Sequence, residues 1–226
     1  MQNLMGVGLA GGMLLWTAVA TAGFEGTIWM KETTDGEVTS HRIHFKGDKV
    51  RMEEVGGEAD GGAVVVDGTR RESFVIDADE QAYFLVPWFT PTPEELKQEL
   101  DGVVVTKTGK KDTIVGYPCE GYLERDKTDG STTELCIAKG FGYQALFGLS
   151  TNETALGSLI PLWLRERLKE GAFPLRSIER DKSGMEVSRF EATKVEAKKL
   201  DDSLFRAPKG YRRMSLDEVG RGRRDG

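Results

Sequence analysis

The sequence predicts a mainly β protein of the α+β class, with one large antiparallel sheet of about ten or eleven strands covered by two helical segments. Three observations lead to this fold class. Apolar and polar residues alternate in many short segments, and 28 glycines supply turns between them. Only two longer segments carry helix signals. The strand–helix–strand alternation that is typical of a parallel sheet does not occur.

The first half of the chain shows the alternation most clearly. In "FEGTIWMK", Phe24, Ile28 and Met30 share one face of a strand, and in "VTSHRIHFK" Ile43 and Phe45 do the same. The turn "TTDGE" separates these two segments, as in a hairpin. The segments "VRMEE", "AVVVDG", "RESFVIDAD" and "QAYFLVP" continue the pattern. We therefore expect a meander of antiparallel strands.

The first helical segment is marked by its capping residues. In "TPTPEELKQELDG", Thr92 is the expected N-cap, Pro93 takes the first helical position and Glu95 completes a capping box. Gly102 is expected to end the helix. Strands are predicted to resume in "GVVVTKT" and "KDTIVGY", followed by "CEGYLER" and "TELCIAK".

The second helical segment is "LSTNETALGSLIPLWLRERLKEG", which opens with Ser150 and Glu153 at the capping-box spacing. Pro161 predicts a break or kink inside it, and Gly171 predicts its end. Two long strands, "AFPLRSIERD" and "MEVSRFEATKVEAKKL", close the sheet. Because a sheet with an uncovered apolar face would aggregate, we expect the two helical segments to cover that face.

The chain begins with an uncharged apolar stretch that ends in the small-x-small pattern Ala20-Thr21-Ala22. This pattern indicates a secretory signal peptide over residues 1–22 and export to the periplasm or the extracellular space. Because no basic residue precedes the apolar stretch, an uncleaved anchor is the alternative. A single domain over residues 23–214 then remains, followed by a disordered basic tail over residues 215–226 that contains "GRGRRDG".

Neither the charge nor the polar clusters indicate nucleic-acid binding or catalysis. The net charge of −6 argues against a nucleic-acid partner. The two histidines, His41 and His44, lie three residues apart in a predicted strand and so point to opposite faces, which argues against a shared metal. Acidic runs such as Glu53-Glu54 and Glu94-Glu95 fall in turns or at a helix N-terminus. We predict that the protein is not an enzyme and has no cofactor.

The two cysteines, Cys119 and Cys136, do not form a C-x-x-C motif, so thioredoxin-type redox chemistry is not indicated. If residues 126–131 form the loop of a hairpin, the two cysteines fall nearly opposite each other on paired strands. An oxidising compartment then favours a disulfide between them over free thiols.

Four phrases, "KGDKVRMEE", "TIVGYPCEGY", "GAFPLRS" and "SLFRAPKGY", occur in an order and spacing that resemble an exported bacterial family of unknown function. That family in turn is similar to the periplasmic lipoprotein carriers with the LolA-like fold. The resemblance covers roughly residues 24–214. It implies an incomplete β-barrel around an apolar cavity closed by helices, and it implies no catalytic residues.

Three hypotheses of function follow. In the first, an exported binding protein holds a lipid, an acyl chain or a lipidated protein in the half-barrel cavity without a cofactor. In the second, the chain is a structural or protein-interaction module of the cell envelope with a packed interior and an envelope protein as partner. A hydrolase with an unrecognised site is a third. The inward-facing candidates, which fit a core or a cavity equally, are Phe24, Ile28, Met30, Ile43, Phe45, Met52, Phe74, Ile76, Tyr83, Leu85, Phe147, Leu162, Trp163 and Leu168.

Overall fold

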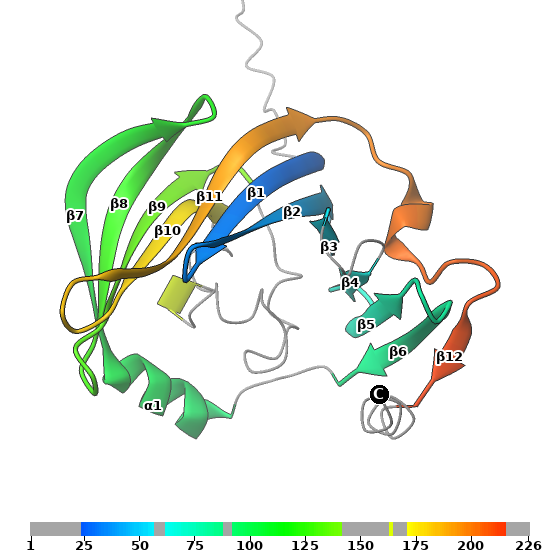
Figure 1. The fold of residues 1–226 in the computed structure, drawn as a ribbon, viewed down its shortest axis with the longest axis horizontal. Helices are drawn as coiled ribbons and strands as arrows, with labels where there is room; N and C mark the ends of the chain where they lie inside the picture. The colour runs from blue at the N-terminus through cyan, green and yellow to red at the C-terminus, as the bar shows by residue number, and fades with distance from the viewer. Residues whose placement is uncertain (1–23, 57–61, 88–91, 142–162, 165–170, 216–226) are drawn as a thin grey trace, which may run out of the picture.

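The computed structural model of the chain describes residues 24–56, 62–87, 92–141, 163–164 and 171–215. These residues form one large, open, curved sheet of twelve strands (Figure 1). The strands are β1 (Gly26–Thr34), β2 (Glu37–Lys46), β3 (Lys49–Val55), β4 (Ala63–Asp67), β5 (Glu72–Asp77), β6 (Ala82–Val86), β7 (Val103–Ile114), β8 (Tyr117–Asp126), β9 (Thr132–Lys139), β10 (Ala172–Arg180), β11 (Glu186–Ala197) and β12 (Arg212–Met214).

Two antiparallel meanders build the sheet. Strands β1 to β6 pair in sequence, as do β7 to β11, and the antiparallel β1–β11 pair joins the two series. The short β12 pairs in parallel with β6, so the sheet runs β12-β6-β5-β4-β3-β2-β1-β11-β10-β9-β8-β7. The predicted antiparallel sheet is confirmed, with twelve strands where ten or eleven were expected.

The strand β7 differs from the prediction in one respect. The segments "GVVVTKT" and "KDTIVGY" were expected to be separate strands, but they form one twelve-residue strand. A shift in the pairing with β8 between Lys107 and Lys111 marks a bulge inside it. Gly109 lies in this bulge with a φ of 74°, a conformation that glycine adopts without strain.

The prediction of two covering helical segments is not borne out. The first predicted helix is present as α1 (Pro93–Gly102), but its described side chains are exposed, including Leu100 at 41%. The described side chains of α1 therefore do not cover the apolar face. Of the second segment, Trp163 and Leu164 lie within the described residues and are helical, and Gly171, its predicted end, lies in a turn. A short 3₁₀ turn, η2 (Asp202–Phe205), completes the described helical structure.

The two termini of the chain, residues 1–23 and 216–226, lie outside the described residues. The predicted signal peptide and most of the predicted basic tail therefore stay predictions. Within the part of the chain that the structure describes, no helix combines the length and the apolar character needed to span a bilayer.

Candidate functional site

The concave face of the sheet carries the larger of two hydrophobic clusters, which we call the concave cluster. Ile28, Met30, Ile43 and Phe45 lie in it at no more than 1% exposure, and Met52 is also buried. All five were predicted to face inward. These side chains pack on the concave face of β1, β2 and β3 as in a protein core.

Aromatic rings close the end of this cluster. The Phe141 ring lies 5.1 Å from the Phe24 ring, 5.1 Å from the Tyr117 ring and 5.9 Å from the Phe173 ring. Phe173 in turn contacts Phe45, with ring centroids 5.4 Å apart. Because rings at these distances are in contact, the described residues leave little room for a ligand at this end of the concave face.

Trp163 is the one inward candidate of the second helical segment that the structure describes. Its indole N–H donates a hydrogen bond to Glu124, and its ring lies 5.9 Å from the Tyr122 ring. Leu164 beside it is fully buried in the concave cluster. The other candidates of that part of the chain lie outside the described residues; they are Phe147, Leu162 and Leu168.

Four of the inward candidates lie on the opposite face of the sheet. Pairing continues the concave face from Met52 through Val64 and Val75 to Phe84. The alternate residues of β5 and β6 therefore point the other way. These residues are Phe74, Ile76, Tyr83 and Leu85, and they form a second cluster with Leu200 and Phe205. A single cavity does not gather all fourteen candidates.

The two histidines point to opposite faces, as expected. On the concave face, the His41 Nε2 lies 2.8 Å from a Glu32 carboxylate oxygen, while its Nδ1 is buried without a hydrogen-bond partner. On the other face, the His44 Nδ1 is hydrogen-bonded to the Thr27 hydroxyl at 2.9 Å. Among the described residues, no group of three or more potential ligands could hold a metal ion.

Glu53, from the acidic pair Glu53-Glu54, forms several ion pairs on the face opposite the concave cluster. The Arg42 Nε donates to one carboxylate oxygen at 2.8 Å and the Arg51 Nε to the other at 2.5 Å. Burial raises the pKa of Glu53, but the hydrogen bonds from His44, Arg42 and Arg51 outweigh it and hold that pKa well below its usual range. Glu53 is therefore a charged structural anchor, and not a poised proton donor.

The predicted disulfide between Cys119 and Cys136 is confirmed, with a Cα–Cα distance of 5.3 Å. In the β8–β9 pairing, Cys119 lies opposite Ala138 and Cys136 opposite Gly121, so the bond crosses the two strands diagonally. Both sulfurs are buried and belong to the concave cluster. The segment "GYPCEGY" is thus part of a covalent link between two strands.

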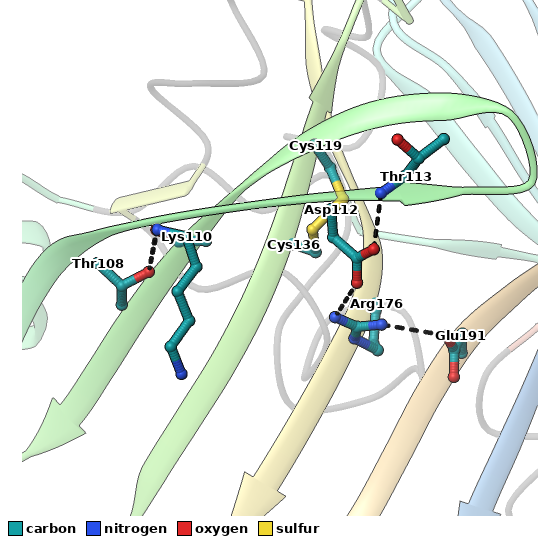
Figure 2. Close-up of a disulfide and its surroundings, with 9 residues drawn as sticks. Thr108, Lys110, Asp112, Thr113, Cys119, Cys136, Arg176 and Glu191 are labelled. Atoms are coloured by element: carbon teal, nitrogen blue, oxygen red, sulfur yellow. Dashed lines mark hydrogen bonds and ion pairs between the residues drawn. A yellow bond between two sulfur atoms is a disulfide. The ribbon is translucent and has the colours of Figure 1, made fainter.

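The sheet curls sharply around this disulfide. Asp112 on β7 and Arg176 on β10 are three strand spacings apart, which is roughly 14 Å across a flat sheet. Their side chains nevertheless meet, with an Arg176 Nη2 to Asp112 Oδ2 distance of 2.8 Å (Figure 2). The Arg176 guanidinium, which also reaches Glu191 at 3.4 Å, holds the pKa of Asp112 below its usual range. The ion pair fixes β7 over β8 and β9.

Gly121 allows the close approach of β7 to β8. A Cβ atom at this position would lie 2.5 Å from the Thr108 hydroxyl oxygen, a distance that real Cβ atoms do not adopt. The Thr108 hydroxyl instead donates a hydrogen bond to the Gly121 carbonyl at 3.0 Å. The bulge of β7 therefore packs directly on the backbone of β8.

Two open grooves flank the disulfide at this end of the sheet, which we call the β7 end (strands β7 to β9). The larger has a volume of about 700 Å³ and combines apolar surface with charges of both signs. It is lined by Lys111, Asp112, Thr113, Pro118, Cys119, Glu120, Ile137 and Lys139. The second, of about 410 Å³, lies over Gly121 and Cys136 and reaches Arg176. The sequence did not predict these grooves, because they depend on the curl of β7.

Similar proteins support the fold. An uncharacterized conserved protein from Thermus thermophilus is 12% identical, with a TM-score of 0.54, over 86% of this chain and 92% of that one. A chain of the Pseudomonas aeruginosa MucA/MucB complex is 16% identical, with a TM-score of 0.51, over 82% of this chain and 56% of that one. A lipoprotein-sorting domain from Vibrio parahaemolyticus is 8% identical, with a TM-score of 0.29, over 83% of this chain and 90% of that one.

The sequence of the chain establishes its family. No curated protein matches the chain. Residues 24–211, most of the domain predicted from the sequence, match the model of DUF4412, a domain of unknown function. This match confirms the resemblance to a family of unknown function. The chain therefore belongs to the DUF4412 family.

Proposed function

We propose that this chain is an exported, non-enzymatic protein-interaction module of the bacterial cell envelope. One observation carries the proposal: the concave face is filled by the chain's own side chains, while both grooves lie open at the β7 end. A packed interior with an exposed edge strand is the arrangement expected of a protein that binds another protein.

Two further findings support export and a protein partner. The disulfide between Cys119 and Cys136 requires an oxidising compartment to persist, as the predicted signal peptide also implies. The MucA/MucB structure records a protein of the same fold in complex with a protein partner. At 16% identity this likeness supports the fold, and the transfer of a protein partner to this chain is our proposal.

The electrostatics favour binding over catalysis. A catalytic acid needs a carboxyl group whose pKa is raised toward neutrality. The carboxyl groups of Glu53 and Asp112 instead have lowered pKa values, because His44 and two guanidinium groups bond to Glu53 and one guanidinium group bonds to Asp112. Such groups act as fixed charges in a structure.

The crosslinking test compares the two edges of the sheet. A photoreactive benzoylphenylalanine replaces Lys110 on β7 or, as the matched control, Arg213 on β12; both residues are exposed. After irradiation of cells that export the protein, we expect a discrete crosslinked protein from position 110 and none from position 213. Equal labelling at both positions, or none at 110, would contradict the proposal.

A lipid or acyl chain on the concave face is the second candidate function. It is favoured by the extent of the concave cluster, which includes residues from strands of both meanders. Delipidated protein incubated with cell-envelope lipids and passed over a gel-filtration column separates the two candidates. The packed face predicts no retained lipid; stoichiometric co-elution of lipid would favour the second candidate.

A further inference from the structure

We propose that the first half of β7, residues 103–105, accepts an extended segment of a partner protein as an added antiparallel strand. The added segment has acidic residues followed by alternating apolar residues. This inference rests on the proposed function and specifies its partner: the recognised feature is an unfolded or extended acidic-apolar segment, and not a folded surface.

The way in which β7 pairs with β8 leaves some of its backbone hydrogen-bonding groups at the open edge of the sheet. The Lys127 N–H donates to the Gly102 carbonyl at 2.9 Å, and residues 103–107 then pair in register with β8. Because antiparallel residues alternate between facing the partner strand and facing away, Val104 bonds to β8 while Val103 and Val105 point outward. This alternation leaves the Val103 C=O and both backbone groups of Val105 at the edge, while the Val103 N–H closes the last turn of α1.

The second half of the same strand is protected. The Asp112 carboxylate accepts a hydrogen bond from the Thr113 N–H at 2.7 Å, and the Thr108 hydroxyl accepts one from the Lys110 N–H at 3.3 Å (Figure 2). The bulge between Lys107 and Lys111 further interrupts any pairing there. Bulges, lysines and capped donors are the devices by which proteins block edge-to-edge pairing. The half with residues 103–105 has none of them.

The side chains of β7 specify what the added strand contains. Val104 and Val105 are 46% and 36% exposed, which offers β-branched surface on both faces of the edge. Further along, Lys110 and Lys111 are exposed, and neither forms an ion pair with another described residue. An antiparallel segment would place its first residues beside these lysines and its last residues beside the valines. Charge complementarity therefore requires acidic residues before the apolar ones.

The test uses a defined peptide and fluorescence anisotropy with the full exported chain. The probe is a labelled peptide of about ten residues, with acidic residues followed by alternating threonine and valine, measured at low salt because charge pairing at an exposed edge is screened at high salt. We expect Val105→Pro to weaken binding about tenfold, because proline removes one outward N–H and leaves the β8 pairing intact. Thr113→Pro, the matched control in the protected half, should change binding less than about twofold.

Two altered peptides test strand addition on the unaltered protein, in case Val105→Pro does not fold. A peptide N-methylated along its threonine–valine part should lose binding to the unaltered protein, because its main-chain donors are blocked. A peptide of reversed order should bind several-fold more weakly. Equal binding of the methylated or the reversed peptide would overturn the inference. So would self-association of the protein that Val105→Pro abolishes, which would assign the edge to a second copy.

Strand addition can fail in these experiments while the protein-interaction role holds. If crosslinking at Lys110 captures a protein partner but the peptide binds no better to the unaltered protein than to Val105→Pro, strand addition is wrong. The protein-interaction role then stands, with the grooves beside the disulfide as its surface.

Discussion

The two faces of the sheet bury apolar side chains in different ways. The concave cluster takes residues from both meanders, so it holds together segments that are distant in sequence. The cluster on the opposite face joins only β4, β5 and β6 to the segment from Leu200 to Tyr211, which contains η2 (Figure 1). The two clusters therefore stabilise different parts of the molecule. The first determines whether the whole sheet folds, and the second determines whether the C-terminal segment docks on it.

The largest expected effect comes from the concave cluster. Phe45 is fully buried and contacts Phe24 and Phe173 from different meanders. We expect Phe45→Ala to lower the free energy of unfolding by about 3–5 kcal/mol, because it leaves a cavity at the junction of the meanders. Urea denaturation followed by circular dichroism measures this. Val38→Ala, at a side chain that is 57% exposed, is the control and should change stability by less than about 0.5 kcal/mol. A similar loss in both variants would contradict the comparison.

The disulfide is the covalent part of the same cluster. It closes a loop with a sequence separation of 17 residues. In the chain-entropy model, its removal costs about 3 kcal/mol. We expect the Cys119→Ala, Cys136→Ala double variant to lose this much stability in thermal unfolding, and reduction of the unaltered protein to have the same effect. If the reductant also lowers the melting temperature of the double variant, the loss has another cause.

The second cluster should respond locally. Phe205 is buried in the second cluster, and the segment that carries it is held to the sheet by that cluster and by the short β12–β6 pair. We expect Phe205→Ala to cost roughly 1–3 kcal/mol, less than Phe45→Ala, because the segment can detach without unfolding of the sheet. Hydrogen exchange should become faster in residues 200–214 and stay unchanged in β1 and β2. Uniformly faster exchange would mean that the two faces are one cooperative unit.

The same contrast explains which features the sequence could predict. Alternation in β2 places Ile43 and Phe45 correctly, because a polar residue separates them and polar residues flank the pair. In β6 every residue is apolar, and in β5 the three apolar residues are consecutive, so alternation does not select a face, and Phe74 and Ile76 were assigned to the wrong side. Their face depends on Phe205, which is far away in the sequence. Only the folded topology brings that cover into place.

In the candidate site, too, the sequence predicts one feature and misses another. The disulfide was predictable because the hairpin between β8 and β9 is local, and turn residues mark its loop. The curl of β7 was not, because it depends on the contact between Asp112 and Arg176, which lie on strands with two others between them. The glycine at position 121 was a signal of close backbone approach, but it does not name the segment that approaches.

The smallest expected effect concerns the charges that link the sheet to the docked segment. Arg51 donates both to Glu53 and to the Leu204 carbonyl, at 2.5 and 3.2 Å. Because the pKa of Glu53 is lowered in the folded state, its contribution to stability is present above the unfolded pKa of about 4.3 and is lost as the pH falls below that value. Glu53→Gln should lower the free energy of unfolding by about 1–2 kcal/mol near neutral pH. The variant should also lose less stability than the unaltered protein as the pH falls through the unfolded pKa. Melting temperatures measured from neutral pH down to about pH 3 give both quantities. Parallel pH profiles for the two proteins would show that Glu53 does not contribute to acid sensitivity, and the docking of the segment would then rest on the second cluster, the contacts of Lys46 and Lys49 and the β12–β6 pair.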